Sequence, residues 1–194
     1  MSVRPSAARP SLDRMALMSM WKETVSAHTG SEPPLVLFLC RTNAAVSIMA
    51  EALLRHLVQG RVRAASAGAT AAASVNPMAL ECLTAHGIPT DELFCKPWGA
   101  FFGYYGPPVR VLITLCDPDI YAAKAHWDQA AVRTVKAHWP TPDPEGAVGT
   151  DLRRAFEEVF DTLEARIRCL LTLPLDFLSD KALARALGQI ADLR

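Results

Sequence analysis

The sequence predicts an α/β fold in which a parallel sheet is covered by helices on both faces. Short runs made only of apolar residues, such as residues 35–39, are typical of strands that are buried on both sides. Segments with helical spacing alternate with these runs along the chain, and this alternation is the pattern of a parallel sheet joined by helices. The 194 residues suit a single domain of this class.

The predicted elements have recognisable boundaries. Asn76 and Pro77 form an N-cap followed by a proline at the first helical position, so a helix is expected to begin there. Thr150 is expected to cap a long helix, and Pro174 precedes a closing helix. In chain order, we expect strand 35–39, helix 47–58, strand 61–66, helix 76–86, strand 109–115, strand 132–136, helix 150–171 and helix 175–193.

Residues 1–34 are expected to form an extension in front of a domain of residues 35–194. Within the extension, residues 11–29 have the spacing of an amphipathic helix, with an apolar stripe at residues 15–21. Gly30 and the two prolines that follow it end this pattern. We expect a helix that docks or frays, with binding of a partner as the alternative.

Composition and charge exclude several classes of protein. Hydrophobic residues make up 51% of the chain, and 20 Lys and Arg balance 20 Asp and Glu, which excludes a disordered chain. Without a basic excess there is no electrostatic reason to expect a nucleic-acid partner. No apolar run reaches the ~18–20 residues of a membrane span. The expectation is a soluble globular protein.

The cysteine pattern predicts reduced thiols. Five cysteines are an odd number, they are widely spaced, and no secretory leader is recognised, so we expect a cytoplasmic protein without disulfides. Cys82 and Cys169 lie in apolar helical segments and are expected to be small core residues. Cys95 lies in the loop 94–97, where exposure is possible. No pair has the spacing of a zinc site, so no metal ligands are expected.

The loop after the first strand is the candidate site. In a parallel sheet, ligands bind at the carboxyl ends of the strands. Cys40 ends the first strand and a helix follows at once, so backbone N–H groups and a helix N-terminus favour a thiolate and can hold an oxyanion. The candidate anion-binding loop consists of Cys40, Arg41, Thr42, Asn43, Ala44, Ala45, Val46 and Ser47.

The segment VLFLCRTNAAVSIMAEALL, residues 36–54, resembles the phosphate-binding loop of the low-molecular-weight protein tyrosine phosphatase superfamily, in particular its thiol-dependent arsenate reductases. The resemblance covers about residues 35 to 190. It implies a three-layer α/β/α fold with a four-stranded parallel sheet. It continues in SAG at 66–68, VNPMALECLTAHGI at 75–88, CKPW at 95–98, VLITLCD at 111–117, HWPTPDP at 138–144 and the helix 153–174.

This resemblance also implies the roles of single residues. Cys40 matches the nucleophile that attacks phosphorus or arsenic, and Asn43 matches the residue that holds the loop in its strained shape. Ser47 matches the hydroxyl that lowers the pKa of the thiol, and Asp143 the general acid. Cys116 matches the reductase cysteine that attacks the arsenic adduct, releases arsenite and leaves a disulfide. No bound cofactor is implied; the reductant is an external thiol, either glutathione with glutaredoxin or thioredoxin.

Two departures from the family pattern affect the expected activity. The family loop reads C-x5-R, but the sixth residue after Cys40 is Val46. A bidentate arginine contact to the developing charge is worth about 3–4 kcal/mol, and Arg41 in the same loop is the residue that could partly replace it. Thioredoxin-coupled relatives also place a third cysteine where this chain has Ala123 and Lys124, so a disulfide would have to be reduced directly.

Four functions are compatible with the sequence. The first is an arsenate reductase, favoured because Cys116 has no use in a phosphatase. The second is an inactive homologue that binds or senses phosphate or arsenate, which Val46 favours. An active protein tyrosine phosphatase is third. The fourth is an interaction protein that uses residues 15–21 or the aromatic run 101–105 as its surface.

Overall fold

The computed structural model describes residues 32–58, 60–102, 106–116 and 134–193. Residues 33–194 form one compact unit. The helix expected within residues 11–29 and the aromatic residues 104–105 lie outside the described residues, as do Ala123 and Lys124. The boundary between extension and domain therefore stays a prediction.

Four parallel strands form one sheet, in the order β2-β1-β3-β4. The register pairs Cys40 at the end of β1 with Gly68 at the end of β2, and Leu39 with Thr114 at the end of β3. The carboxyl ends of these three strands therefore meet at one edge of the sheet. The strands are β1 (Leu35–Cys40), β2 (Arg63–Gly68), β3 (Val111–Thr114) and β4 (Val135–His138).

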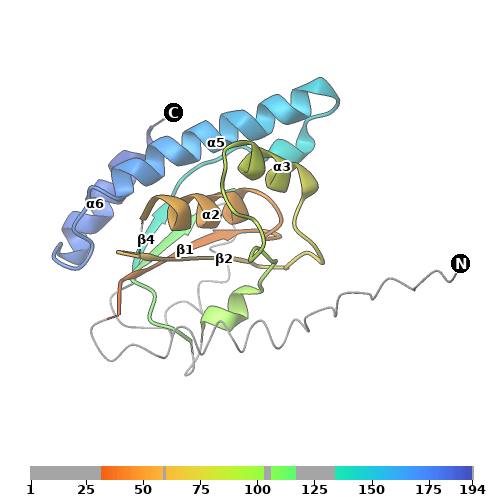
Figure 1. The fold of residues 1–194 in the computed structure, drawn as a ribbon. Coiled ribbons are helices and arrows are strands. Elements are labelled where there is room, and N and C mark those ends of the chain that lie inside the picture. Colours follow the sequence, from red (N-terminus) through yellow and green to blue (C-terminus); the bar gives the residue numbers. More distant parts are fainter. Residues whose placement is uncertain (1–31, 59, 103–105, 117–133, 194) are drawn as a thin grey trace, which may run out of the picture. The chain divides into compact units, whose positions relative to one another are not determined.

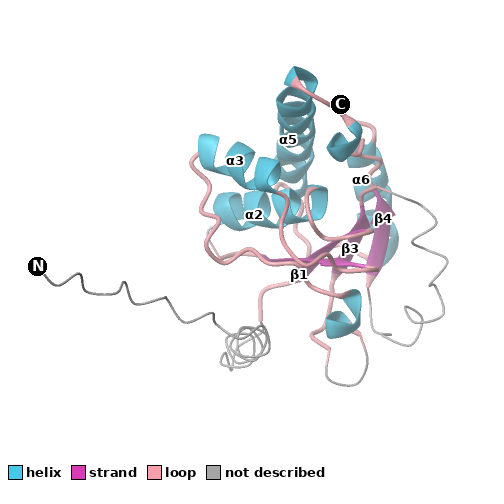
Figure 2. Ribbon diagram, turned by 90° about the vertical axis from the view of Figure 1, so that its right-hand side faces the viewer, coloured by secondary structure: helices cyan, strands magenta, loops and turns pink. Residues whose placement is uncertain are grey.

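Helices flank the sheet on both sides. Figure 1 shows α2, α3 and α5 on one side of the sheet and the short 3-10 helix η1 on the other, and Figure 2 gives the same arrangement from the side. Helix α6 packs against β4 and α5. The predicted α/β fold around a four-stranded parallel sheet is confirmed. The helices are α2 (Val46–Val58), α3 (Pro77–Ala85), η1 (Trp98–Phe101), η3 (Pro144–Gly146), α5 (Thr150–Leu170) and α6 (Asp180–Ala191).

Some predicted boundaries are wrong. The fourth strand continues to His138 rather than ending at 136, and the beginning expected for it, residues 132–133, lies outside the described residues. Gly149, with φ 64°, holds the N-cap position of α5 that was expected for Thr150. The closing helix begins at Asp180 rather than at 175. The reason is Arg110, whose Nε and Nη2 donate to the carbonyls of Leu175 (3.1 Å) and Leu178 (3.0 Å). These contacts hold residues 175–178 in a turn.

The core lies between the sheet and the helices. Phe38 and Trp139 are completely buried, with ring centroids 6.3 Å apart. The Trp139 indole Nε1 donates to the carbonyl of Leu187 at 3.0 Å, which fixes α6 against the end of β4. Among the described helices, none combines the length and hydropathy that crossing a membrane requires.

Candidate functional site

The loop between β1 and α2 has its carbonyl groups turned outward. The amides of residues 69, 70, 72 and 76 donate to the carbonyls of residues 40, 41, 42 and 44, at 3.2, 2.9, 2.8 and 2.8 Å. With these carbonyls engaged on one side, amides of the loop face the sulfur of Cys40 on the other. The Asn43 amide lies 3.1 Å from Sγ. Such a ring of N–H groups is an anion-binding concavity.

Cys40 is buried, at 4% exposure, and its Sγ lies 2.8 Å from the Ser47 hydroxyl. That hydroxyl oxygen also accepts a hydrogen bond from Asn43 Nδ2 at 2.9 Å, and it can either accept from the Cys40 thiol or donate to the thiolate. Burial raises the pKa of the Cys40 thiol, while the hydrogen bonds from Ser47 and from the backbone lower it. Burial is the largest of these contributions, so the pKa of Cys40 lies above its usual value.

Asn43 joins the loop to the strand behind it. Its φ of 54° is left-handed, a conformation that asparagine tolerates better than most residues. The side-chain amide donates to Ser47 Oγ and, at 2.8 Å, to Ser66 Oγ on β2, and its carbonyl accepts from the Lys96 amide at 2.7 Å. Both amide protons and the oxygen are therefore used. This is the geometry that a residue holding a strained loop needs.

Behind Asn43 lies a buried charged cluster that sequence analysis missed. Glu51 is fully buried on α2, and it accepts hydrogen bonds from the Ser66 hydroxyl and from Lys96 Nζ, the latter at 2.9 Å. Arg55 pairs with the same carboxylate at 2.5 Å. The available signal was a carboxylate in the middle of the apolar run 48–54, where a charge needs a partner. The cluster closes the back of the site.

The loop that carries Lys96 is fixed against the sheet, and this corrects one expectation. The Lys96 carbonyl accepts from the Gly68 amide at 2.8 Å, and Lys96 Nζ also donates to the Phe94 carbonyl at 2.9 Å. As a result, Cys95 is buried, at 4% exposure, and is not open to solvent. Gly68 itself lies against the candidate anion-binding loop of residues 40–47, because a Cβ there would come within 2.7 Å of the Thr42 carbonyl carbon.

Val46 occupies the position where the family pattern has arginine. It is the first residue of α2, is 3% exposed, and packs in the apolar core. An isopropyl group offers no hydrogen-bond donor to an anion. Arg41, by contrast, is exposed, and its charge lowers the pKa of Cys116, so the guanidinium lies within electrostatic reach of the second thiol.

Cys116 and Asp143 lie at the same edge of the sheet as Cys40. Cys116 lies two residues after the end of β3 and is half-buried. Burial, together with the charges of Cys40, Asp143 and Glu145, raises its pKa to about 12. The Asp143 carboxylate caps η3 by accepting from the Glu145 amide at 3.0 Å. The two thiols and the carboxylate predicted to act together are thus neighbours.

Asn76 connects η3, which follows Asp143, to the candidate anion-binding loop of residues 40–47. The Asn76 amide donates to the Ala44 carbonyl, and the Asn76 side chain caps α3 by accepting from the Met78 amide at 2.8 Å. The same side chain donates to the Glu145 carboxylate at 2.6 Å. Asn76 was predicted only as a helix cap, and its contact with Glu145 spans 69 residues, too far for sequence spacing to indicate.

Comparison with known proteins identifies relatives of this fold. A family model described as Low molecular weight phosphotyrosine protein phosphatase matches residues 35–186. A search of curated proteins gives no match.

Solved structures of the same fold include reductases and phosphatases. A thioredoxin-dependent arsenate reductase from Corynebacterium glutamicum is 25% identical, with a TM-score of 0.54, over 82% of this chain and 69% of that one. The arginine phosphatase YwlE from Geobacillus stearothermophilus is 21% identical, with a TM-score of 0.56, over 76% and 99%. The tyrosine phosphatase Wzb from Escherichia coli K30 is 20% identical, with a TM-score of 0.58, over 71% and 96%.

Proposed function

Because the chain belongs to the low molecular weight phosphotyrosine protein phosphatase family, we propose that it is an arsenate reductase-like enzyme of that family. Its two working thiols are Cys40 and Cys116. The observation that supports this choice is their position: Cys40 ends β1 and Cys116 follows β3, and these strands are parallel neighbours, so both thiols lie at one edge of the sheet. A phosphatase acts through one nucleophile and gains nothing from a second thiol beside it.

In the proposed reaction, the Cys40 thiolate forms a bond to the arsenic of arsenate. Asp143 donates a proton to the departing oxygen, which leaves as water. The Cys116 thiolate then attacks Cys40 Sγ, and the electron pair of the sulfur–arsenic bond passes to arsenic. Arsenic is reduced from the pentavalent to the trivalent state, and the two thiols become a disulfide. An external thiol, glutathione or a thioredoxin-type dithiol, returns the two electrons.

The loop amides are suited to holding the oxyanion during this reaction. The Asn43 amide faces the sulfur, and the loop precedes the N-terminus of α2, whose dipole favours negative charge. Among solved relatives, one arsenate reductase has been captured in a phosphate-binding state, at 24% identity.

A second candidate is a protein that binds the oxyanion without turnover. The buried, apolar Val46 favours it, because the arginine it replaces would supply charged contacts in the transition state. Loss of such contacts costs about 3–4 kcal/mol, or a hundred- to thousandfold in rate. Backbone amides would still bind phosphate or arsenate.

The decisive experiment is intact mass spectrometry of the reduced chain after incubation with arsenate, with and without glutathione. Arsenate-dependent loss of two hydrogens, mapped to Cys40 and Cys116, or an arsenate-dependent glutathione adduct, supports the reductase. Cys40→Ser should abolish this change, and Cys169→Ser is the matched control that should not. An unchanged mass together with phosphate binding supports the second candidate.

The variant Val46→Arg separates the two candidates further. If it creates arsenate-dependent oxidation that the natural chain lacks, one residue accounts for the lost turnover. If Val46→Arg instead hydrolyses a phosphotyrosine substrate without oxidising thiols, the reductase assignment is wrong and the chain is closer to a phosphatase.

A further inference from the structure

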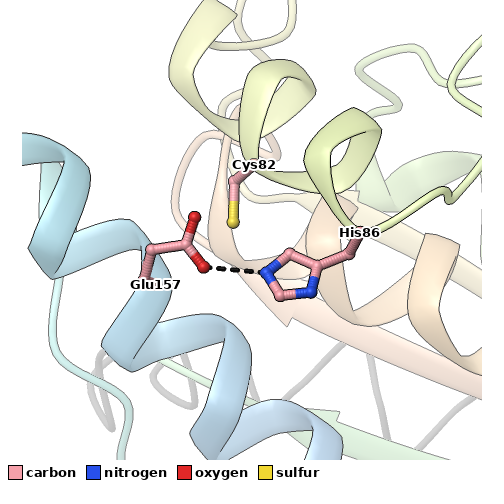
Figure 3. A group of neighbouring side chains, drawn as sticks. All are labelled: Cys82, His86 and Glu157. Atoms are coloured by element: carbon pink, nitrogen blue, oxygen red, sulfur yellow. Dashed lines mark hydrogen bonds and ion pairs between the residues drawn. The ribbon is translucent and has the colours of Figure 1, made fainter.

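Away from the nucleophile loop, three side chains with metal-binding atoms meet between α3 and α5. Cys82 and His86 come from α3 and Glu157 from α5, and Figure 3 shows their polar ends turned toward one another. One ligand atom from each lies within 4.8 Å of the other two. The closest pair is His86 Nε2 and Glu157 Oε2, at 2.8 Å. Cys82 is buried, whereas the other two are about one-third exposed, so solvent reaches the cluster.

The backbone presents these groups in a fixed arrangement. Cys82 and His86 are one helical turn apart, and the His86 amide, at the C-cap of α3, donates to the Cys82 carbonyl at 3.2 Å. Residues with this spacing lie on the same helix face. The His86 ring stacks on Phe160 of α5, with centroids 3.8 Å apart and an angle of 16° between the ring planes. The imidazole is therefore held with its Nε2 edge toward Glu157.

The local charge favours a cation. Burial and the charges of Glu157 and Asp161 raise the pKa of Cys82 to about 12, and Arg153 opposes them only as the smallest contribution. The C-terminal end of a helix carries partial negative charge, and the last turn of α3 contains no basic residue to neutralise it. A positive ion at this position would offset all three sources of negative potential.

We propose that Cys82, His86 and Glu157 bind a divalent cation of the zinc class. Thiolate, imidazole and carboxylate are the ligand types of zinc, whereas magnesium and calcium select oxygen ligands only. A tetrahedral zinc ion holds its ligand atoms about 3.3–3.6 Å apart. The three ligand atoms lie within 4.8 Å of one another, and His86 Nε2 and Glu157 Oε2 are 2.8 Å apart, so binding requires these two atoms to separate slightly. Three protein ligands leave a fourth position for water.

Binding releases the proton of the Cys82 thiol to solvent and involves no redox step. The sulfur exchanges its 3.9 Å contact with the Phe156 carbonyl for a bond to the metal. His86 binds through Nε2 after this nitrogen gives up the proton that it shares with Glu157. The ion then links α3 to α5. It stabilises the folded chain by an amount that grows with the logarithm of its concentration above the dissociation constant, because the unfolded chain does not hold the three ligands together.

No metal ligands were expected from the sequence, because the three residues are not close together along the chain. Cys82 and His86 alone look like two residues on a helix face. Glu157 is separated from His86 by 71 residues, and only the packing of α3 on α5 brings it to them.

Zinc titration of the full chain against a chromophoric chelator tests the site. The expected result is one bound zinc per chain, with affinity weakened by about a hundredfold or more in Cys82→Ser, His86→Gln and Glu157→Gln, since even loss of an outer-shell partner costs 10- to 100-fold. Cobalt(II) in place of zinc should give a thiolate-to-metal charge-transfer band that disappears in Cys82→Ser. Zinc should also raise the melting temperature of the natural chain and not that of His86→Gln.

Two controls show whether the metal binds at this cluster. Cys169→Ser should bind zinc like the natural chain, and so should Cys40→Ser with Cys116→Ser, which removes the other pair of neighbouring thiols. Absence of zinc binding overturns the proposal, as does binding that survives His86→Gln and Glu157→Gln or is lost with Cys40 and Cys116. If Cys82→Ser fails to fold, the two variants at the partly exposed positions still decide the question.

Discussion

Replacing Asn43 with alanine should strongly destabilise the chain. The substitution removes three side-chain hydrogen bonds at once, those to Ser47, Ser66 and the Lys96 amide. An unpaired buried N–H costs about 1–3 kcal/mol, and each of the other two bonds contributes about 0.5–1.5 kcal/mol. Alanine at a φ of 54° adds about 1–2 kcal/mol. The expected loss is about 3–8 kcal/mol, a large part of the 5–15 kcal/mol that stabilises a typical domain.

A matched variant separates the hydrogen bonds from the backbone strain. Asn43→Gly loses the same three hydrogen bonds, but glycine adopts a positive φ without steric penalty. Asn43→Gly should therefore be more stable than Asn43→Ala by about 1 kcal/mol, even though glycine usually destabilises a folded chain relative to alanine.

Urea unfolding, followed by tryptophan fluorescence, to which the buried Trp139 contributes, gives the free energy of unfolding of both variants. The reasoning is refuted if Asn43→Ala loses less than about 1 kcal/mol, a value too small for an unpaired buried amide. It is refuted equally if Asn43→Ala is as stable as Asn43→Gly, because the left-handed backbone at this position would then cost nothing.

Three further predictions concern the surroundings of the loop and the buried thiols. Gly68→Ala should lower the free energy of unfolding by about 1–3 kcal/mol in urea, because its methyl group would lie 2.7 Å from a backbone atom of the nucleophile loop. Glu51→Gln should lower it by about 3–5 kcal/mol, since the buried Lys96 ammonium loses its anionic partner, and Glu51→Gln with Lys96→Met should recover part of the loss. Stability should fall as pH rises from about 9 toward 12, because Cys82 and Cys116 have pKa values near 12 in the folded chain against a usual value of 9.0, so the unfolded chain releases these protons first.

Each of these three predictions has a control. Gly99→Ala adds a methyl group where nothing lies within 4 Å and should leave stability nearly unchanged; an equal loss there would argue against crowding at Gly68. If the double variant at Glu51 and Lys96 is no more stable than the single one, an unpaired charge is not the cause of the loss. In thermal melts between pH 8 and 11, Cys82→Ser should show a shallower decline than the natural chain, and an identical slope would contradict the assignment.

Local signals in the sequence were sufficient for the fold. An uninterrupted apolar run predicted β1, and Asn76 with Pro77 predicted the start of α3, because both depend on neighbouring residues only. The start of α6 was predicted five residues too early, since the contacts of Arg110 that hold the preceding turn come from 65 to 68 residues away. Long-range contacts of this kind leave no trace in local periodicity.

In the candidate site, too, residues of the local motif were predicted, whereas residues brought together by long-range packing were not. Cys40, Asn43 and Ser47 were predicted as a group, and the structure brings them into hydrogen-bonding contact. Glu51 and Lys96 were not predicted, because one lies within a helix and the other in a loop 45 residues later, and only packing pairs them. The hydrogen bond by which Ser47 lowers the pKa of Cys40 was predicted from the motif, whereas the burial that raises this pKa was not. Hydrogen bonds can be inferred from a motif, but the depth of burial that outweighs them cannot.

The raised pKa of Cys40 has a consequence for how readily peroxide oxidises its sulfur. Peroxide oxidises the thiolate far faster than the thiol, and enzymes with strongly acidic catalytic cysteines lose activity through sulfenic and sulfinic acid formation. A cysteine that is buried, and whose pKa burial raises, is a poorer target for that damage than an exposed, acidic one. Burial of Cys40 therefore disfavours its irreversible oxidation.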